Sequence, residues 1–396
     1  MNFKTNLISI VAIAAITFIS CTQGEEIFTK DAQSYISDEN FVTVDEAIKN
    51  ADTFLRSLPA ETRMTESPRE VKEVIAYTLR DQSVIATRAQ GDAYSLDAPL
   101  FYAINYKENR GFVLASADDR YVPIYAYVPE GNFEKSDIQE SGFKDILNNL
   151  VSMVSNPNDS NLLKLNNETT ETRTRPSAIG HKLVTKWGGG SPYNCKSFFS
   201  NVVSTAVALT QACAYFKYPS HIDYADYGDS VHVDIDWNAI RAESYANGRR
   251  LIYLDSCAQQ VGHMMHFYEY AYNDVTLYNV HRSLTWMRRL GYSIPQAMMS
   301  VDNNGFDEYA HESLYDYDGV VFTVGFTQMD SSGNVSGGHS WIIDGFNDPF
   351  YHCNWGLDGA YDGLYQKSLF KPNNAQNFQY KLYVAPIMKY PDDWYE

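Results

Sequence analysis

Apolar residues recur at helical spacing in two segments of the N-terminal half. The first is TVDEAIKNADTFLRSL, which begins at Thr43. Thr43 is a typical N-cap, and Asp45 and Glu46 put negative charge in the first turn, where the helix dipole favours it. The second is SDIQESGFKDILNNLVSMVSN, residues 136–156. Both patterns predict amphipathic helices.

Between these two segments, residues 99–131 consist of strand-like runs. The sequence PLFYAINYKENRGFVLASADDRYVPIYAYVPEG is rich in aromatic and β-branched residues and is broken at KENRG and ADDR. Such runs, bounded by turn residues, predict successive strands. We therefore expect residues 41–155 to form one small α/β domain.

Residues 156–180 interrupt this patterning. The segment NPNDSNLLKLNNETTETRTRPSAIG is rich in Asn, Thr, Ser and Glu and has few large apolar residues, which predicts a linker. Exposed polar segments are preferred sites of proteolytic nicking. Arg173 and Arg175 are candidate cut sites, although Pro176 protects the bond that follows Arg175.

The remaining chain, residues 181–396, has helical patterns first and strand patterns later. SNVVSTAVALTQACAYFKYP and CAQQVGHMMHFYEYAY have helical character, whereas GVVFTVGFTQM, GGHSWIIDGF, PFYHCNWG and GLYQKSLF are strand-like. Helices followed by strands indicate an α+β arrangement. The chain is therefore expected to contain two folded units joined by the linker.

Composition and charge narrow the class of partner. The 396 residues are 44% hydrophobic, enough for a substantial core, and 49 acidic residues outnumber 31 basic ones, for a formal charge of −18. Phosphate contacts need clustered Lys and Arg, so we expect no nucleic-acid partner.

The first residues have the pattern of an export signal. MNFKTNLISIVAIAAITFISC has a basic start and an apolar run too short for a comfortable membrane span, which predicts a signal peptide over residues 1–20. The small residue before Cys21 resembles a bacterial lipobox. We therefore expect a cell-envelope lipoprotein, lipidated at Cys21, tethered by residues 21–40 and attached to the membrane only through lipid; ordinary secretion is the alternative.

The sequence shows no pattern for a metal or another cofactor. Its other cysteines form no CxxC pair, so a structural zinc site is not expected. His263, His266 and Glu269 share one face of a predicted helix, but the four-residue His spacing of HExxH is absent. We expect no metal and no cofactor.

The C-terminal strands contain the candidate chemistry. His339 follows two glycines at the start of one strand, and Asn354 and Trp355 lie in a second strand about fifteen residues on. A hairpin would bring His339 and Asn354 side by side, so that an amide holds the imidazole and an indole shields it. Upstream, the helix of residues 200–219 offers two candidate nucleophiles, Ser204 and Cys213.

These motifs resemble a known family. GGHSWIIDGF, FYHCNWGLDGAYDGLY, WGGGSPYN and AYFKYP resemble the streptopain-like cysteine peptidases (family C10), and GFVLASADDRYVPIYAYVPEGNF resembles that family's inhibitory propeptide. The resemblance covers residues 41–390. It implies a papain-like catalytic fold behind a pro-domain that occludes the cleft until it is cleaved. It implies that His339 is the catalytic histidine and that Asn354 and Trp355 are the family's Asn-Trp pair.

The resemblance also identifies two departures from the family pattern. Counting back from Lys217-Tyr218-Pro219, the nucleophilic cysteine falls on Ser204, and the glycine before it on Val203. The glutamine that stabilises the oxyanion falls on Gly189. Losing one such donor typically lowers the rate by about 10²–10³.

Cys213 is not expected to replace the missing thiol. It lies nine residues beyond Ser204, which is half a turn away in direction and about 13 Å along the helix axis. It also lacks the helix N-terminus that lowers a thiol pKa. The simpler interpretation is a small buried hydrophobic residue.

Three functional hypotheses follow. In the first, the chain is a catalytically impaired peptidase homologue whose cleft binds a peptide or a protein. In the second, it is an active endopeptidase with Ser204 as nucleophile, His339 as base and Asn354 as orienting residue. In the third, the pro-domain of residues 41–155 inhibits a related protease.

Overall fold

The computed structural model describes most of the chain in a set of segments. These are residues 40–59, 69–78, 81, 98–135, 142–154, 176–197, 199–226, 228–240, 256–269, 275–300, 306–326, 328–332, 334–336, 338–370 and 380–389. The predicted signal peptide, Cys21, the tether and most of the predicted linker lie outside them. Within these segments, no helix has the length and apolar character that a membrane span requires.

The N-terminal unit contains the predicted helices and strands. Its elements are α2 (Val44–Ser57), β1 (Val71–Thr78), β2 (Pro99–Tyr106), β3 (Phe112–Ser116), β4 (Ile124–Val128) and α3 (Gly142–Val154). Thr43 caps α2 as predicted. Its side-chain oxygen accepts from the Glu46 amide at 3.3 Å, and the Glu46 carboxylate accepts from the Thr43 amide at 2.9 Å. This reciprocal capping box fixes where α2 begins.

The C-terminal unit places helices beside an antiparallel sheet. Its helices are α4 (Ser204–Phe216), α6 (Ser256–Glu269), α7 (Leu277–Arg289) and α8 (Phe306–His311), with short helical segments η4 (Tyr193–Lys196), η5 (Glu312–Asp316) and η6 (Lys367–Phe370). Its main strands are β10 (Val320–Phe326), β13 (His339–Asn347), β14 (Phe350–Asn354), β15 (Gly363–Gln366) and β16 (Tyr380–Lys389). The mixed helix and sheet composition agrees with the predicted α+β class.

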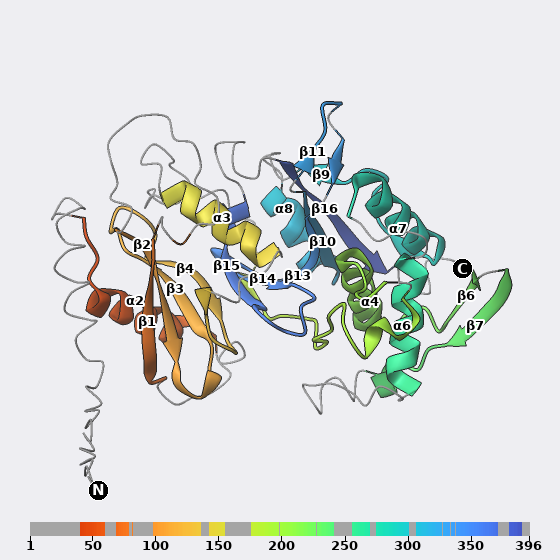
Figure 1. The fold of residues 1–396 in the computed structure, drawn as a ribbon, viewed down its shortest axis with the longest axis horizontal. Helices are drawn as coiled ribbons and strands as arrows, with labels where there is room; N and C mark the ends of the chain where they lie inside the picture. Colours follow the sequence, from red (N-terminus) through yellow and green to blue (C-terminus); the bar gives the residue numbers. More distant parts are fainter. Residues whose placement is uncertain are drawn as a thin grey trace, which may run out of the picture.

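Short strands complete this unit. β8 (Tyr292–Ser293) and β9 (Met299–Ser300) pair with β16, and β11 (Gln328–Met329) pairs with β12 (Val335–Ser336). A separate hairpin consists of β6 (His221–Asp226) and β7 (Asp229–Asp234). Figure 1 shows this hairpin at the end of the molecule remote from the N-terminal unit.

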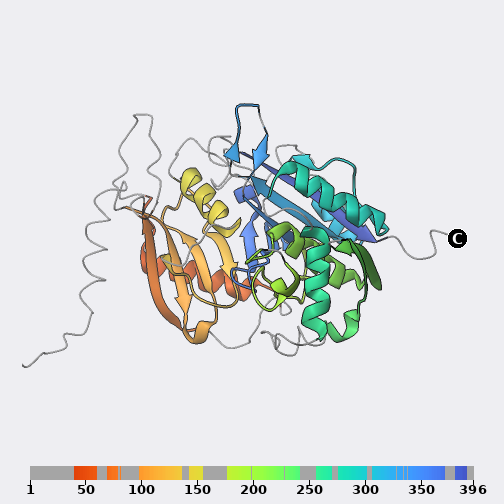
Figure 2. The same ribbon diagram turned by 45° about the vertical axis from the view of Figure 1, so that its right-hand side comes forward.

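The two units share one sheet, which the sequence did not predict. Among the described residues the order is β1-β2-β3-β4-β15-β14-β13-β10-β16-β8. The junction is the antiparallel pairing of β4 with β15, in which Tyr127 faces Leu364 and Ala126 faces Tyr365. Figures 1 and 2 show the N-terminal strands continuing into those of the C-terminal unit. The N-terminal unit is therefore attached by backbone hydrogen bonds as well as by side chains.

A common hydrophobic core reinforces this junction. One cluster of buried residues includes Phe112 and Phe143 from the N-terminal unit and Trp341 and Tyr365 from the C-terminal unit. The rings of Phe143 and Tyr361 stack with 4.1 Å between centroids. Because these apolar surfaces leave water together, separating the units would re-expose both.

The predicted linker ends earlier than residue 180. Ala178 and Ile179 form strand β5, which pairs with Asn347 and Phe346 at the end of β13. The polar composition of residues 156–180 concealed this pairing, because a two-residue strand leaves almost no periodic pattern. The linker prediction for residues 155–175 falls outside the described segments.

Candidate active site

Ser204 is the first residue of α4, as the sequence predicted. Val203 before it is extended, with φ −66° and ψ 143°, and its side chain makes no capping hydrogen bond. All ten residues from Thr205 to Ala214 are buried, and the helix packs against β13 and α6. A helix buried on all sides lies in the core, so only its ends reach the site.

The hydroxyl of Ser204 is held by the strand that carries His339. Its Oγ accepts a hydrogen bond from the Ser340 amide at 3.0 Å, and the hydroxyls of Thr205 and Ser340 lie 2.9 Å apart. No hydrogen bond joins Ser204 to the imidazole of His339, both of which lie in the described segments. The predicted nucleophile and base are therefore neighbours along the α4–β13 contact, but they lack the hydrogen bond through which a proton would be transferred.

His339 is buried at the start of β13, with 7% of its surface exposed. Its Nε2 lies 2.6 Å from the carbonyl oxygen of Trp355. A carbonyl only accepts, so Nε2 carries the proton. Burial lowers the pKa of His339 to about 4, and the hydrogen bond to Trp355 only partly opposes this shift. The imidazole is therefore neutral at neutral pH.

Asn354 does not orient His339, which corrects the sequence prediction. In the β13–β14 hairpin, Asn354 faces Ile342, three residues beyond His339. Its Oδ1 accepts from Gln211 Nε2 at 2.8 Å, and its Nδ2 donates to the Thr185 carbonyl at 2.9 Å. The side-chain amide is thus used in joining α4, β14 and the segment before α4. The hairpin prediction was right, but its register sends the amide elsewhere.

Trp355 is fully buried, and its backbone carbonyl takes the orienting role. Its carbonyl accepts from His339, while its amide donates to Asp362 Oδ1 at 2.7 Å. Burial raises the pKa of Asp362 to about 7. The indole lies 4.8 Å from the ring of Trp341. The indole is fully buried, and its predicted shielding of His339 stays a prediction.

Gly189 lies at the predicted oxyanion position, and its surroundings leave no space for a side chain. Its carbonyl accepts from the Val202 amide at 2.8 Å. A Cβ on Gly189 would lie 2.4 Å from the Val202 carbonyl oxygen. The family glutamine therefore does not fit here without moving the strand-like segment that leads into α4.

The N-terminal unit covers this site. A Cβ on Gly142, the first residue of α3, would lie 2.5 Å from Cζ3 of Trp355 and 3.1 Å from Cδ2 of His339. Only a residue without a side chain allows α3 to lie so close to these two rings. The surface pocket lined by Lys217, Trp237 and Gln260 lies at the opposite end of α4. The start of α3 thus covers His339 and Trp355, whereas Ser204 is half-exposed.

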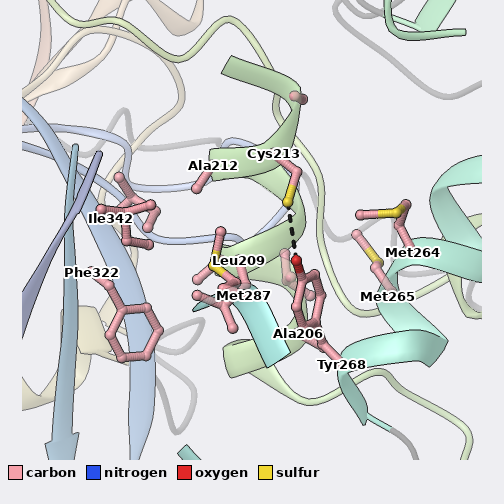
Figure 3. Packing of buried hydrophobic residues seen from close by; sticks show 14 of the residues in the cluster. Ala206, Leu209, Ala212, Cys213, Met264, Met265, Tyr268, Met287, Phe322 and Ile342 are labelled. Carbon is pink, nitrogen blue, oxygen red and sulfur yellow. Dashed lines mark hydrogen bonds between the residues drawn. The ribbon is translucent and has the colours of Figure 1, made fainter. Parts of the chain in front are cut away.

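Cys213 lies in the core, on the side of α4 away from the site. Figure 3 shows its sulfur pointing between α4 and α6 toward Tyr268, whose hydroxyl lies 3.2 Å away. Burial raises its pKa to about 11, the opposite of what a nucleophilic thiol needs. Among the cysteines of the described segments, Cys213, Cys257 and Cys353 are buried and Cys195 is exposed.

The three residues considered for a metal do not converge. His263 Nδ1 lies 2.6 Å from the Tyr224 hydroxyl, and Glu269 Oε1 accepts from the Val203 amide at 3.3 Å. His266 faces Asp226 at 3.9 Å. No group of three or more His, Cys, Asp or Glu residues in the described segments is arranged to hold a metal ion.

Four residues of the site were not predicted to act there: Gly142, Ser340, Asp362 and Glu269. Ser340 directly follows His339, and this adjacency was the only signal in the sequence that could have identified it as a site residue. Gly142 and Asp362 reach the site through the packing of distant segments, and no local pattern marks them. Glu269 was considered only as a metal ligand, whereas the structure places it beside the start of α4.

Comparisons with known proteins agree with this architecture. Residues 39–154 match the family model of the Spi protease inhibitor, and residues 187–365 match the model of the peptidase C10 family. The structure is similar to Prevotella intermedia prointerpain A, with a TM-score of 0.53 and 19% identity, covering 74% of this chain and 96% of that one. Active wild-type interpain A cysteine protease of the same organism aligns over 55% of this chain and 97% of its own, with 20% identity and a TM-score of 0.38. No curated protein matches the sequence.

Proposed function

The chain belongs to the peptidase C10 family and carries its propeptide-type inhibitor domain, and on that basis we propose that it is an exported, catalytically impaired member whose peptidase frame binds a peptide or protein. The signal-peptide pattern predicted for residues 1–20 and the lipobox-like position of Cys21 support export and lipid anchoring. The remaining argument concerns the site itself.

One observation carries the proposal: the group at the nucleophile position is a hydroxyl that makes no hydrogen bond to the histidine in the described segments. Ser204 Oγ accepts from the Ser340 amide instead. A hydroxyl is far less acidic than a thiol and needs a base to remove its proton in the transition state. The neutral His339 donates its Nε2 proton to the Trp355 carbonyl, which leaves Nδ1 as the nitrogen that could act as a base, but no hydrogen bond in the described segments joins His339 to Ser204. The described geometry therefore supports a site that does not activate Ser204.

Two further features support impaired catalysis. Gly189 has no side chain to donate to an oxyanion, and the adjacent Val202 backbone excludes one. Asn354 is bonded to Gln211 rather than to His339. Loss of the oxyanion donor and loss of the orienting amide are each expected to lower the catalytic rate. An oxyanion donor typically contributes a factor of about 10²–10³ to that rate.

Binding requires that the site be uncovered. The described conformation already has a protein segment, the start of α3, against His339 and Trp355. The same surface would receive an external peptide or protein segment once α3 moves away. We therefore expect binding to be weak in the intact chain and stronger after the linker between residues 155 and 175 is cut and α3 displaced.

The test compares the purified mature chain with its Ser204→Ala and His339→Ala variants. Casein and a mixed peptide library are incubated with each protein, with the linker intact and cut. We expect no cleavage that depends on Ser204. Casein cleavage, or labelling by a fluorophosphonate, that disappears in both variants would instead establish the active endopeptidase with Ser204 and His339.

A second candidate function is inhibition of a related protease by the N-terminal unit. The match of residues 39–154 to the Spi protease inhibitor model favours it. The shared sheet and core argue that this unit is not readily released from its own chain. Adding the intact and the linker-cut chain to an active C10 peptidase tests the idea, and unchanged activity of that peptidase with both would contradict it.

A further inference from the structure

A buried carboxylate lies at the start of α4, beside the nucleophile position. Glu269, from α6, is fully buried. Its Oε1 accepts a hydrogen bond from the amide of Val203, the residue directly before Ser204, at 3.3 Å. α4 and α6 pack against each other, so this contact is fixed by two helices rather than by a loop.

No cation neutralises this carboxylate within the described segments. None of the ion pairs there includes Glu269. Its pKa is raised, because burial outweighs the lowering effect of the hydrogen bonds from Ser197 and Val203. An uncompensated buried charge is costly, so some other group must stabilise it.

The start of α4 supplies that stabilisation. The first turn of α4 has no acidic residue, and Val203 provides no side-chain cap. The first amides of a helix have no intrahelical partner, and the helix dipole favours negative charge at this end. Glu269 is thus the negative group that this helix end requires, supplied by a neighbouring helix.

In a Cys-His peptidase this end of the helix faces a thiolate, and an imidazolium lies opposite. Here both have been replaced by neutral groups, because Ser204 has a hydroxyl and His339 is a neutral imidazole held on Trp355. We propose that Glu269 supplies the negative charge at the start of α4 that the thiolate supplies in an active relative. This inference rests on the proposed loss of peptidase function.

The consequence is that returning a cysteine does not by itself return a reactive thiolate. Two titratable groups adjoin residue 204 through neighbouring residues: Glu269, from α6, accepts from the Val203 amide, and His339, from β13, precedes Ser340, whose amide donates to Ser204. The first turn of α4 adds no acidic residue. A neighbouring carboxylate disfavours a second negative charge, and a neutral imidazole does not compensate. The pKa of a cysteine thiol at position 204 is therefore expected to lie at or above about 8.5, the value of an unperturbed thiol.

The experiment measures the thiolate directly in the full mature chain. The ultraviolet absorbance of the thiolate is followed against pH for Ser204→Cys, and the absorbance of the parent is subtracted to remove the other cysteines. The same titration is run on Ser204→Cys/Glu269→Gln, which keeps an oxygen to accept from Val203 but has no charge. Ser204→Cys/Glu134→Gln, altered at an exposed glutamate of the N-terminal unit, is the matched control.

We expect Glu269→Gln to lower the titration midpoint of the introduced thiol by about one unit or more and Glu134→Gln to leave it unchanged. A smaller shift, or a rise, would overturn the role of Glu269. If the double variant does not fold, Ser204→Cys alone decides: a midpoint at or above about 8.5 supports the proposal, and a lower one contradicts it. Casein cleavage by the parent chain would overturn the proposed function without changing this titration, so the two failures are distinguishable.

Discussion

Gln211, in the interior of α4, donates from its side-chain amide to Asn354 Oδ1 at 2.8 Å. Its own oxygen accepts from the Thr185 hydroxyl at 2.9 Å. Asn354 completes the set by donating to the Thr185 carbonyl. The amide that the sequence assigned to the histidine therefore belongs to a buried hydrogen-bond network joining helix, sheet and the segment that precedes α4.

Replacing Gln211 with Leu should destabilise the fold. Gln211 is fully buried, and its loss leaves the Thr185 hydroxyl and the Trp187 amide without this partner, whereas the Asn354 oxygen still accepts from the Gly356 amide. Each orphaned buried group costs about 1–3 kcal/mol, so we expect the free energy of unfolding to fall by at least about 2 kcal/mol. Denaturant unfolding measures it, with the half-buried Gln259→Leu on α6 as control. An equal effect of the two variants would mean that the network contributes little.

Restoring the family glutamine at Gly189 should damage the fold rather than repair the site. A Cβ there lies 2.4 Å from the Val202 carbonyl oxygen, whereas one on Gly190 has its nearest contact, Asn201 Oδ1, at 3.9 Å. We expect Gly189→Gln to lower stability by about 1–3 kcal/mol through overpacking. Gly190→Gln, one residue on, should be nearly neutral. Thermal unfolding of both variants checks this, and equal stability would show that the Val202 backbone yields easily.

Local patterns predicted the elements, whereas long-range packing decided the site. The capped helix at Thr43 and the strand beginning at His339 depend on residues close in sequence, and both were predicted correctly. The position of Asn354 depends on the register between β13 and β14, where a shift of a few residues redirects a side chain. A register is set by turn geometry and by what each face contacts, which no local pattern contains.

The joining of the two units shows the same limit. β4 and β15 are about 240 residues apart in sequence, and each has the pattern of an ordinary buried strand. Nothing in either segment specifies its neighbour. The family resemblance of residues 41–390 predicted the two domains correctly. A resemblance to proteins of known fold contains information on how segments pack, which the periodicity of a single sequence does not. The family resemblance did not predict the proposed role of Glu269 at the start of α4. That role depends on Ser204, where this chain departs from the family motif.

A larger residue at Gly142 should push α3 away from the site. A Cβ at this position would lie 2.5 Å from the ring of Trp355. We expect Gly142→Leu to raise the rate of amide hydrogen exchange and of proteolytic cutting in α3 by about tenfold or more, since each 1.4 kcal/mol of local destabilisation is a factor of about ten. Gly180→Leu is the matched control, because a Cβ there meets nothing within 4 Å. Unchanged exchange in α3 would show that Trp355 moves instead of the helix.

The pH dependence of stability should reveal the carboxyl that holds Trp355. Burial raises the pKa of Asp362 from 3.8 to about 7. The folded chain therefore binds this proton more tightly than the unfolded chain does. The resulting stabilisation is complete below the unfolded pKa and is lost as the pH rises from about 4 through about 7.

Asp362→Asn removes this titration while keeping an oxygen to accept from the Trp355 amide, a bond of 2.7 Å. We expect the variant to become more stable relative to the parent as the pH rises. The difference between their free energies of unfolding should grow by on the order of 1–2 kcal/mol between about pH 5 and about pH 8. Denaturant unfolding across this range measures it, and Asp358→Asn, at an exposed site four residues earlier, is the control. A difference that stays constant with pH would mean that Asp362 ionises at the same pH in the folded and unfolded chains. Asp362 would then be a charged carboxylate at neutral pH when it accepts from the Trp355 amide.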